Sequence, residues 1–382
     1  MTAQLTETTR VPARRSRGLG ATAISSRATR DPFFDNAKFL LVILVVVGHN
    51  WAPFAQSSRV AEALYLTLYA FHMPAFVLIC GYFSRSFTGR PDQLVRLVSG
   101  VLLPYLAFEV LYSAAYVVVM DRPFAVTPTV PTYLCWFLLA LFLWRLTVPL
   151  WRGIRYPVVV AALVSLGAGL TDTGDELALS RVLMFLPWFV LGTRLRPELL
   201  RPLRTPLARW LALVVMPSAL VGAYWLAPRL SAGWLLMTYD HRELNTAVPG
   251  YLLTRLAIFA VGAVLVAAFL ALVPRRRTAF TALGAVTLYP YLLHGLLVKT
   301  VQGCGGYDTM VGGGLPVLAL STLGAVALGV LLCAVPVRRL VRPLVEPSLP
   351  RWLVTGEGRG TSREARGERV RELTDSRRGG SA

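Results

Sequence analysis

A lysine and a histidine lie eleven residues apart within the apolar stretch of residues 34–54. In an α-helix eleven residues turn the chain by about 1100°, three turns and roughly 20°, so Lys38 and His49 share one face. The rise between them is about 16.5 Å, roughly half the hydrocarbon thickness of a bilayer. Asp35, fourteen residues before His49, lies within about 40° of the same stripe. The spacing predicts a carboxylate and an ammonium group at a membrane surface, in line with an imidazole near mid-depth.

An ionisable group at that depth is costly and by default indicates a function. An imidazole in a dry site can serve as general base for a hydroxyl acceptor or as a transient acyl carrier. Either role requires a hydroxyl and an activated acyl group to meet beside His49. The structural alternative is a histidine that is hydrogen-bonded to a neighbouring helix.

Basic side chains predicted at the inner membrane surface can hold a donor that carries phosphates. They are Lys38, Arg85, Arg90 and Arg96. For the arginines, ordinary anchoring of positive charge on the cytoplasmic side is the simpler explanation. The sequence has no GxSxG serine elbow and no CxxC or HExxH pattern, so it supports neither a serine-hydrolase triad nor a metal site.

Two further histidines lie beside prolines in apolar segments. His72 comes two residues before Pro74, which frees a backbone carbonyl one turn earlier in the helix. His294 comes four residues after Pro290. Each histidine either satisfies a freed backbone group or contacts substrate. Arg181, at the outer start of the sixth predicted helix, either binds an anionic or hydroxyl-rich acceptor or extends to the membrane interface.

Charged residues are scarce in this chain of 382 residues, at 15%, while 55% are hydrophobic. The mean hydropathy is +0.57, whereas a soluble domain has about 25% charged residues. These values predict an all-α polytopic membrane protein with about ten transmembrane helices. The predicted spans cover residues 37–54, 61–84, 94–120, 131–150, 156–171, 180–193, 207–227, 247–273, 282–301 and 313–336. The fifth and sixth are short for a span that needs about 20 residues.

Arginine is concentrated in alternate loops of this ten-helix scheme. The loops after helices two, four, six and eight carry it, as do both tails, while the loops between them carry little. This alternation predicts both termini in the cytoplasm and a multi-pass protein of the inner (plasma) membrane. The net charge of +19 therefore indicates topology and not nucleic-acid binding. The Arg-dominated, Ala/Val/Leu/Gly-rich composition is typical of a GC-rich bacterial genome.

The predicted organisation has three parts. Residues 1–30 form a disordered basic cytoplasmic tail, residues 31–345 form the membrane domain, and residues 346–382 form a second disordered cytoplasmic tail. We expect the first apolar segment to be a signal anchor and not part of a cleavable signal peptide.

These residues resemble the acyltransferase type 3 family of integral membrane O-acyltransferases, and within it the fucose 4-O-acetylase-like branch. A basic residue, ten intervening positions and a histidine in the first helix form the most specific family pattern, which Lys38 and His49 match. Further resemblance lies at residues 34–38, 71–76, 81–83, 96, 104–105, 134–138, 181–192 and 291–294. It covers roughly residues 31–345 of the chain.

The resemblance implies transfer of an acyl group from cytoplasmic acyl-CoA, usually acetyl-CoA, to a hydroxyl of a sugar or glycan. It implies acetyl-CoA as a co-substrate, with no bound cofactor, and His49 as the catalytic imidazole. Some members carry an Arg-x-x-Arg pair after the second helix, a spacing that Arg90 and Arg96 do not match. The substrate-binding residues that we predict are Asp35, Lys38, His72, Arg96, Arg181 and His294.

Two other functions suit the same features. Ten helices with kinks and intramembrane polar groups also suit a transporter or flippase for a glycan or small metabolite, although the sequence shows no inverted repeat. A non-catalytic membrane assembly protein is a third reading, which the buried polar residues disfavour. Covalent transfer of label from acetyl-CoA distinguishes the enzyme from the other two.

Overall fold

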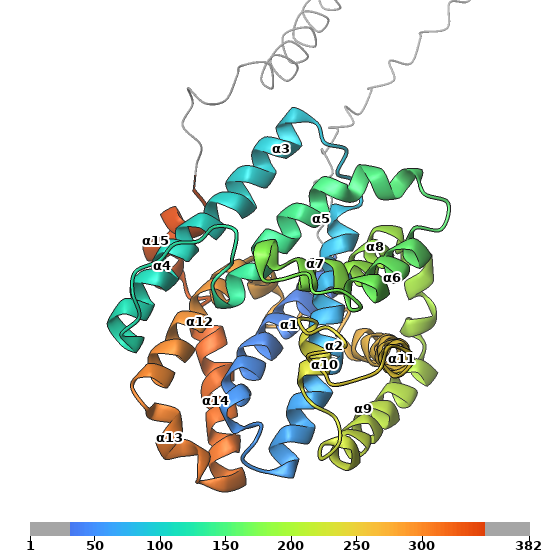
Figure 1. Ribbon diagram of the computed structural model, residues 1–382. Coiled ribbons are helices and arrows are strands. Elements are labelled where there is room, and N and C mark those ends of the chain that lie inside the picture. Colours follow the sequence, from blue (N-terminus) through green and yellow to red (C-terminus); the bar gives the residue numbers. More distant parts are fainter. Residues whose placement is uncertain (1–30, 348–382) are drawn as a thin grey trace, which may run out of the picture. The chain divides into compact units, whose positions relative to one another are not determined.

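The computed structural model describes residues 31–347, and these residues form helices without any strand (Figure 1). The all-α prediction is therefore confirmed for this part of the chain. The two predicted tails, apart from residues 346–347, lie outside the described residues. The α-helices are α1 (Pro32–Trp51), α2 (Arg59–Ser84), α3 (Pro91–Leu97), α4 (Leu103–Met120), α5 (Trp136–Gly153), α6 (Pro157–Ala168), α7 (Leu179–Met184), α8 (Leu186–Arg194), α9 (Pro206–Leu226), α10 (Gly233–Leu236), α11 (Val248–Leu272), α12 (Leu288–Gly303), α13 (Gly306–Val311), α14 (Gly314–Leu331) and α15 (Val335–Val345).

Seven helical segments of the described chain are long and apolar enough to cross a membrane. They are Pro32–Phe54, Arg59–Ser84, Pro91–Met120, Tyr133–Gly153, Pro206–Leu226, Val248–Leu272 and Gly314–Leu331. An eighth crossing is formed if α7 and α8, which meet at 57°, are counted as one broken span. The chain is thus a polytopic helical membrane protein, as its composition predicted.

Three of the ten predicted spans differ from simple membrane-crossing helices. The fifth corresponds to α6, which has 12 residues, and the sixth is the bent pair of α7 and α8. The ninth was predicted to begin at residue 282, but residues 281–285 form a 3-10 turn and α12 begins only at Leu288, with 16 residues. Short or broken helices are tolerated at membrane depth where other helices cover their backbone groups.

Local sequence sets several of the helix starts. Ser58 caps α2, because its hydroxyl accepts a hydrogen bond from the backbone N–H of Ala61 at 3.2 Å. Prolines occupy the first turn of α3, α6 and α9, where their missing N–H would have no partner within the helix. These caps fix where each helix begins and the loop before it ends, and hence which residues lie at the two ends of the bundle.

Helix α2 packs against α1, α8, α9 and α11 and so holds the bundle together. Its closest contact is with α8, where two glycines let the backbones touch. A Cβ on Gly81 would overlap the carbonyl oxygen of Phe189, and one on Gly192 would overlap that of Leu78. Small residues are the usual means of bringing membrane helices this close. The bent pair of α7 and α8 is therefore anchored against the central helix.

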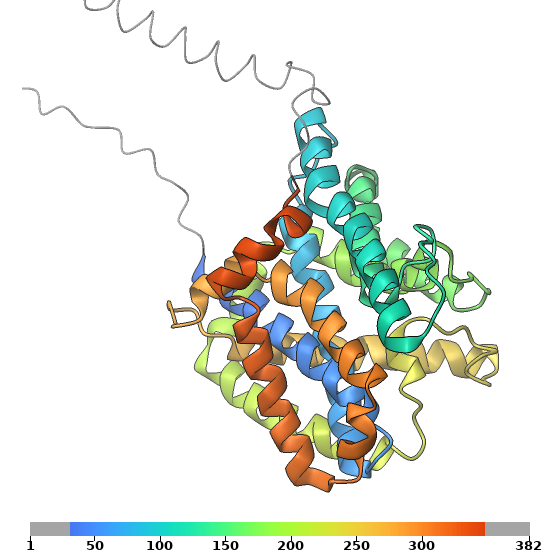
Figure 2. The same ribbon diagram turned by 90° about the vertical axis from the view of Figure 1, so that its left-hand side faces the viewer.

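The arginine-rich loops contact one another at one end of the bundle. Arginine or asparagine side chains of one segment donate to backbone carbonyls of another: Arg152 to Arg85, Arg194 to Trp151, Arg275 to Leu203, and Asn36 to Pro274 and Arg276. The start of α1, the segment after α11 and α15 lie on the same side (Figure 2).

The arginine-poor loops form a second set of contacts. Arg59 donates from Nε to the carbonyl of Tyr224 at 2.6 Å, and the backbone N–H of His241 donates to Gly169 O at 3.0 Å. Both contacts join segments next to arginine-poor loops.

Candidate active site

His49 lies in the last turn of α1, beside a cavity of about 380 Å³. Helix α1 ends at Trp51, so His49 is nearer to the end of its helix than the predicted span of residues 37–54 implied. The cavity is formed by α1, α2, α5, α7, α10 and α12 and the turn that precedes α5. Its polar and aromatic lining consists of His49, Tyr65, Tyr69, His72, Tyr133, Trp136, Arg181, Tyr291, Lys299 and Gln302.

One nitrogen of the His49 ring is held and the other is free. The hydroxyl of Tyr133 lies 2.8 Å from Nδ1, and the two ring centroids are 5.0 Å apart. Nε2 makes no hydrogen bond to any described residue. The ring is therefore oriented through one edge while the other edge is available to a reactant.

The backbone around Tyr133 is held in an unusual conformation. Tyr133 has φ of +52°, in the left-handed region that residues with a side chain rarely adopt. The carboxylate of Glu109 accepts the backbone N–H of the preceding residue, Thr132, at 2.8 Å. The hydroxyl of Tyr291 donates to the carbonyl of the following residue, Leu134, at 2.5 Å. Such strain is found where the surrounding structure imposes it, often at functional sites.

Tyr133 is a site residue that sequence reasoning missed. It precedes the family-like segment 134–138, but a single tyrosine in an apolar run carries no recognisable pattern. It reaches His49 across 84 positions of sequence. Lys299, the second missed residue, lines the same cavity, and its Nζ lies 4.5 Å from the centroid of the Tyr133 ring.

His72 and His294 each make a hydrogen bond to a backbone carbonyl of their own helix, although neither acceptor is the carbonyl that the nearby proline frees. His72 donates from Nδ1 to Leu68 O at 2.7 Å, and His294 donates from Nδ1 to Pro290 O at 2.8 Å. In both, the acceptor is the carbonyl four residues earlier. His72 also lines the cavity, and the His294 ring lies 5.2 Å from that of His49. The buried Nε2 of His294 has no hydrogen-bond partner in the described chain.

Arg181 is the predicted substrate-binding arginine that reaches the cavity. Its guanidinium carbon lies 5.2 Å from the centroid of the Trp136 ring. Lys299 donates to the side-chain oxygen of Gln302 at 2.8 Å, and both Arg181 and Lys299 line the cavity together with Tyr133, Leu134 and Trp136.

Asp35 and Lys38 lie elsewhere, near the start of α1. Lys38 Nζ is 2.7 Å from Asp35 Oδ1 and 5.2 Å from the centroid of the Phe83 ring. Neither residue lines the cavity beside His49. The shared helix face therefore places Lys38 and His49 in line, but in different surroundings.

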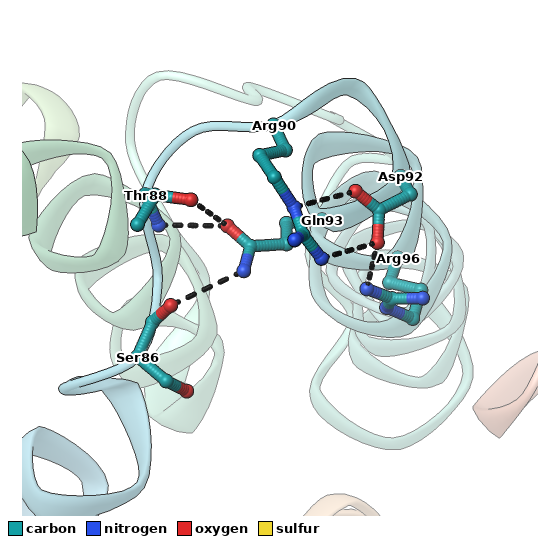
Figure 3. Close-up of polar contacts among 6 residues, drawn as sticks. All are labelled: Ser86, Thr88, Arg90, Asp92, Gln93 and Arg96. Atoms are coloured by element: carbon teal, nitrogen blue, oxygen red, sulfur yellow. Dashed lines mark hydrogen bonds and ion pairs between the residues drawn. The ribbon is translucent and has the colours of Figure 1, made fainter. Parts of the chain in front are cut away.

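Arg96 is also distant from the cavity and carries a counter-ion. The guanidinium groups of Arg96 and Arg90 both bind the carboxylate of Asp92 (Figure 3). The distance from Arg90 Nε to Asp92 Oδ1 is 3.1 Å. The side chain of Arg96 is 67% exposed. A donor phosphate at this position would have to compete with Asp92.

Comparison with known proteins identifies the family of this chain. The type 3 acyltransferase family model, described as an acyltransferase domain, matches residues 31–353. No curated protein and no solved structure matches the chain. The matched region contains every helix described above, including all the residues that surround His49. The chain therefore belongs to the type 3 family of membrane acyltransferases.

Proposed function

We propose that the protein is an O-acyltransferase that moves an acetyl group from cytoplasmic acetyl-CoA to a hydroxyl of a sugar or cell-surface glycan. The observation that carries this proposal is the His49 imidazole, held by Tyr133 at Nδ1 and free at Nε2 beside a polar cavity. Membership of an acyltransferase family favours this reaction over transport or flipping of a glycan. The resemblance to the fucose 4-O-acetylase-like branch supports a sugar as the acceptor.

Nε2 of His49 can serve both roles that the chemistry allows. As general base it needs a lone pair at Nε2, which requires the ring proton at Nδ1 and a donated hydrogen bond to Tyr133 Oη. The acceptor hydroxyl then gives its proton to Nε2 and its oxygen attacks the thioester carbonyl. The carbon–sulfur bond breaks and the departing thiolate takes the proton from His49. As acyl carrier, the same Nε2 attacks the carbonyl first and the carbon–sulfur bond breaks to release the thiolate; the acceptor hydroxyl then takes the acetyl group from Nε2 and its proton passes to the thiolate.

The cavity lining supports a sugar as the group that meets His49. Tyr65, Tyr69 and Trp136 provide aromatic surfaces, and His72 and Gln302 provide polar groups. Small-molecule sites commonly combine apolar and aromatic walls with a few placed polar groups. A sugar ring has apolar faces and polar edges, so it matches both parts of this lining.

The donor has to approach from the arginine-rich end of the bundle, which we place in the cytoplasm together with both termini. Lys38 lies toward that end of α1, about 16.5 Å along the helix from His49. We therefore assign Lys38 and Asp35 to the donor route, with Arg96 at its entrance, and His72, Arg181 and His294 to the acceptor side of the inner-membrane protein.

Replacing Lys38 with glutamine is expected to raise the KM for acetyl-CoA about tenfold, equivalent to about 1.4 kcal/mol, while kcat changes little. The reason is the loss of a cation beside the donor route. Steady-state kinetics of the purified protein measure both constants. The matched comparison is Lys38→Arg, which keeps the positive charge and should keep the KM near the wild-type value. An equal rise of KM in both variants would contradict a donor contact through this charge.

Replacing Tyr133 with phenylalanine is expected to lower kcat about 10- to 100-fold, because the imidazole loses the partner that orients it. The aromatic ring and its packing remain. The KM for acetyl-CoA should stay near the wild-type value, since Tyr133 does not lie on the donor route. Tyr156→Phe, an exposed tyrosine on the loop before α6, is the control. Unchanged kcat in Tyr133→Phe would show that the 2.8 Å contact does not position His49.

The reaction itself is tested with membranes that contain the full-length protein and acetyl-CoA labelled in the acetyl group. Label should appear in glycan or lipid-linked sugar, and it should be released by mild base as expected for an ester. Uptake of a glycan without covalent labelling would support the transporter and overturn the proposed reaction. Mass spectrometry of surface glycans from a deletion strain and its parent would identify the missing acyl group.

A further inference from the structure

The cavity beside His49 contains two cations and no carboxylate from the described residues. Arg181 and Lys299 both line it, whereas no Asp or Glu does. Elsewhere in the described chain, several cations lie within 4.0 Å of a carboxylate: Lys38 with Asp35, Arg90 and Arg96 with Asp92, and Arg342 with Glu346. Neither Arg181 nor Lys299 has such a partner. The cavity is therefore electropositive.

Arg255 shows how this protein satisfies an arginine that has only a structural role. It is completely buried in α11, and it donates to the hydroxyl of Tyr251 at 2.9 Å and to the carbonyl of Trp234 at 2.8 Å. The guanidinium of Arg181, in contrast, makes no hydrogen bond to a described residue and contacts the Trp136 ring. Charged side chains within membrane segments usually pair or bind a ligand. Arg181 has its donors available for one.

The two cations contact one short segment that also contacts His49. Lys299 lies over the ring of Tyr133, and Arg181 lies over the ring of Trp136, three residues further along. Tyr133 in turn holds His49. A ligand that placed a negative group at this wall would therefore bring its neighbouring hydroxyls close to the free Nε2.

We propose that the acceptor of the acyl group is anionic, and that Arg181 and Lys299 bind its carboxylate or phosphate group. This inference rests on the proposed function, because it specifies the class of sugar that enters the same cavity. A carboxylate belongs to a sugar acid, and a phosphate belongs to a sugar phosphate or to a lipid-linked sugar. A guanidinium suits both groups, since its planar donors match either one in a bidentate manner.

The test uses three probes that differ chiefly in charge: glucose, glucuronate and glucose 6-phosphate. Binding to the purified full-length protein is followed as the shift of its melting temperature during titration, at constant ionic strength. We expect at least one of the two anionic probes to bind about tenfold more tightly than glucose, a difference of about 1.4 kcal/mol. The stronger of the two identifies the carboxylate or the phosphate source. Equal binding of all three probes, or no binding of either anion, would overturn the proposal.

Two variants assign the binding to the named cations. Arg181→Gln and Lys299→Gln should each lower affinity for the preferred anion about tenfold and leave glucose binding unchanged. Arg181→Lys, which keeps the charge, should recover part of the loss and guards against a folding defect. Arg229→Gln is the control, because Arg229 lies in an arginine-poor loop and does not line the cavity. Wild-type anion affinity in both glutamine variants would overturn the proposal.

A second measurement separates this inference from its main alternative and from the proposed reaction. If the cations instead stabilised the oxyanion of the transition state, their removal would lower kcat with every acceptor and leave probe binding intact, which would overturn an acceptor role. His49→Ala should keep the anion affinity of the wild type and lose transfer. Transfer that persists in His49→Ala would refute the proposed reaction even where the anion binds as expected.

Discussion

Replacing His49 with alanine is expected to lower acyl transfer by about a thousandfold or more while the protein remains inserted in the membrane. General acid–base catalysis contributes about 10²- to 10⁴-fold, and an acyl carrier cannot act at all without its nucleophile. The His49 imidazole lies beside the cavity, is oriented by Tyr133 through Nδ1, and makes no hydrogen bond to a described residue at its second nitrogen. Transfer of label from acetyl-CoA measures the loss, and melting temperature of the purified variant measures folding.

The control for this substitution is His241→Ala. His241 lies in an arginine-poor loop, does not line the cavity, and makes a hydrogen bond from Nδ1 to the carbonyl of Thr246 at 3.1 Å. We expect it to keep transfer near the wild-type rate. Wild-type transfer by His49→Ala would remove the physical basis of the enzyme mechanism, and only family membership would remain.

An acid quench of the wild-type protein during turnover distinguishes the two roles of His49. An acyl carrier accumulates an acetyl group on the imidazole, which mass spectrometry detects as an added mass on the peptide that contains His49. A general base never bonds to the acetyl group, so the peptide keeps its mass. Both results agree with the expected loss in His49→Ala, and each assigns a different first step.

The alignment of Lys38 and His49 on one helix could be predicted because its signal is local. Lys38 and His49 belong to one continuous helix, and helical periodicity alone relates their positions. What surrounds each of them could not be predicted in this way. The same helix face leads from an ion pair with Asp35 at one end to a cavity at the other, because different helices pack against its two halves.

Tyr133 and Glu109 illustrate contacts that no single-sequence pattern reveals. The partner of Tyr133 lies 84 residues away, and the acceptor role of Glu109 involves a backbone N–H, that of Thr132. A backbone group has no identity in the sequence, so the carboxylate of Glu109 has no visible partner there. Arg96 differs, because Asp92 lies four residues before it on a helix, which is a recognisable ion-pair spacing.

One of the ten predicted spans, the sixth, is broken between α7 and α8, and hydropathy alone could not predict this break. Hydropathy does not change across the 57° bend between α7 and α8, since the residues on both sides are apolar. The one sequence feature at the break is Pro187, in the first turn of α8. A proline within a predicted span indicates either a kink or the start of a new helix, so Pro187 alone does not predict the bend. Apolar content thus locates the membrane segments, while their breaks depend on packing against α2.

Replacing Gly295 with alanine is expected to lower acyl transfer at least about tenfold, because overpacking at this contact shifts neighbouring groups at a cost of about 1–3 kcal/mol. A Cβ on Gly295 would overlap Leu134 Cδ2 and Tyr112 Oη, and it would lie 3.0 Å from the ring of Tyr133. The segment that holds His49 must therefore move away from α12. Turnover and melting temperature of the purified variant measure the two effects.

Gly222→Ala in α9 is the matched control, because a Cβ there has no atom within 4 Å. It should leave transfer unchanged. Gly295→Ala combined with Leu134→Ala and Tyr112→Phe removes both overlapping groups, so this triple variant should regain part of the lost activity if the single change acts by displacing Tyr133. A single Gly295→Ala variant with wild-type turnover would mean that the Tyr133 segment can shift without disturbing His49, and the assignment of Tyr133 as the positioning residue would then be wrong.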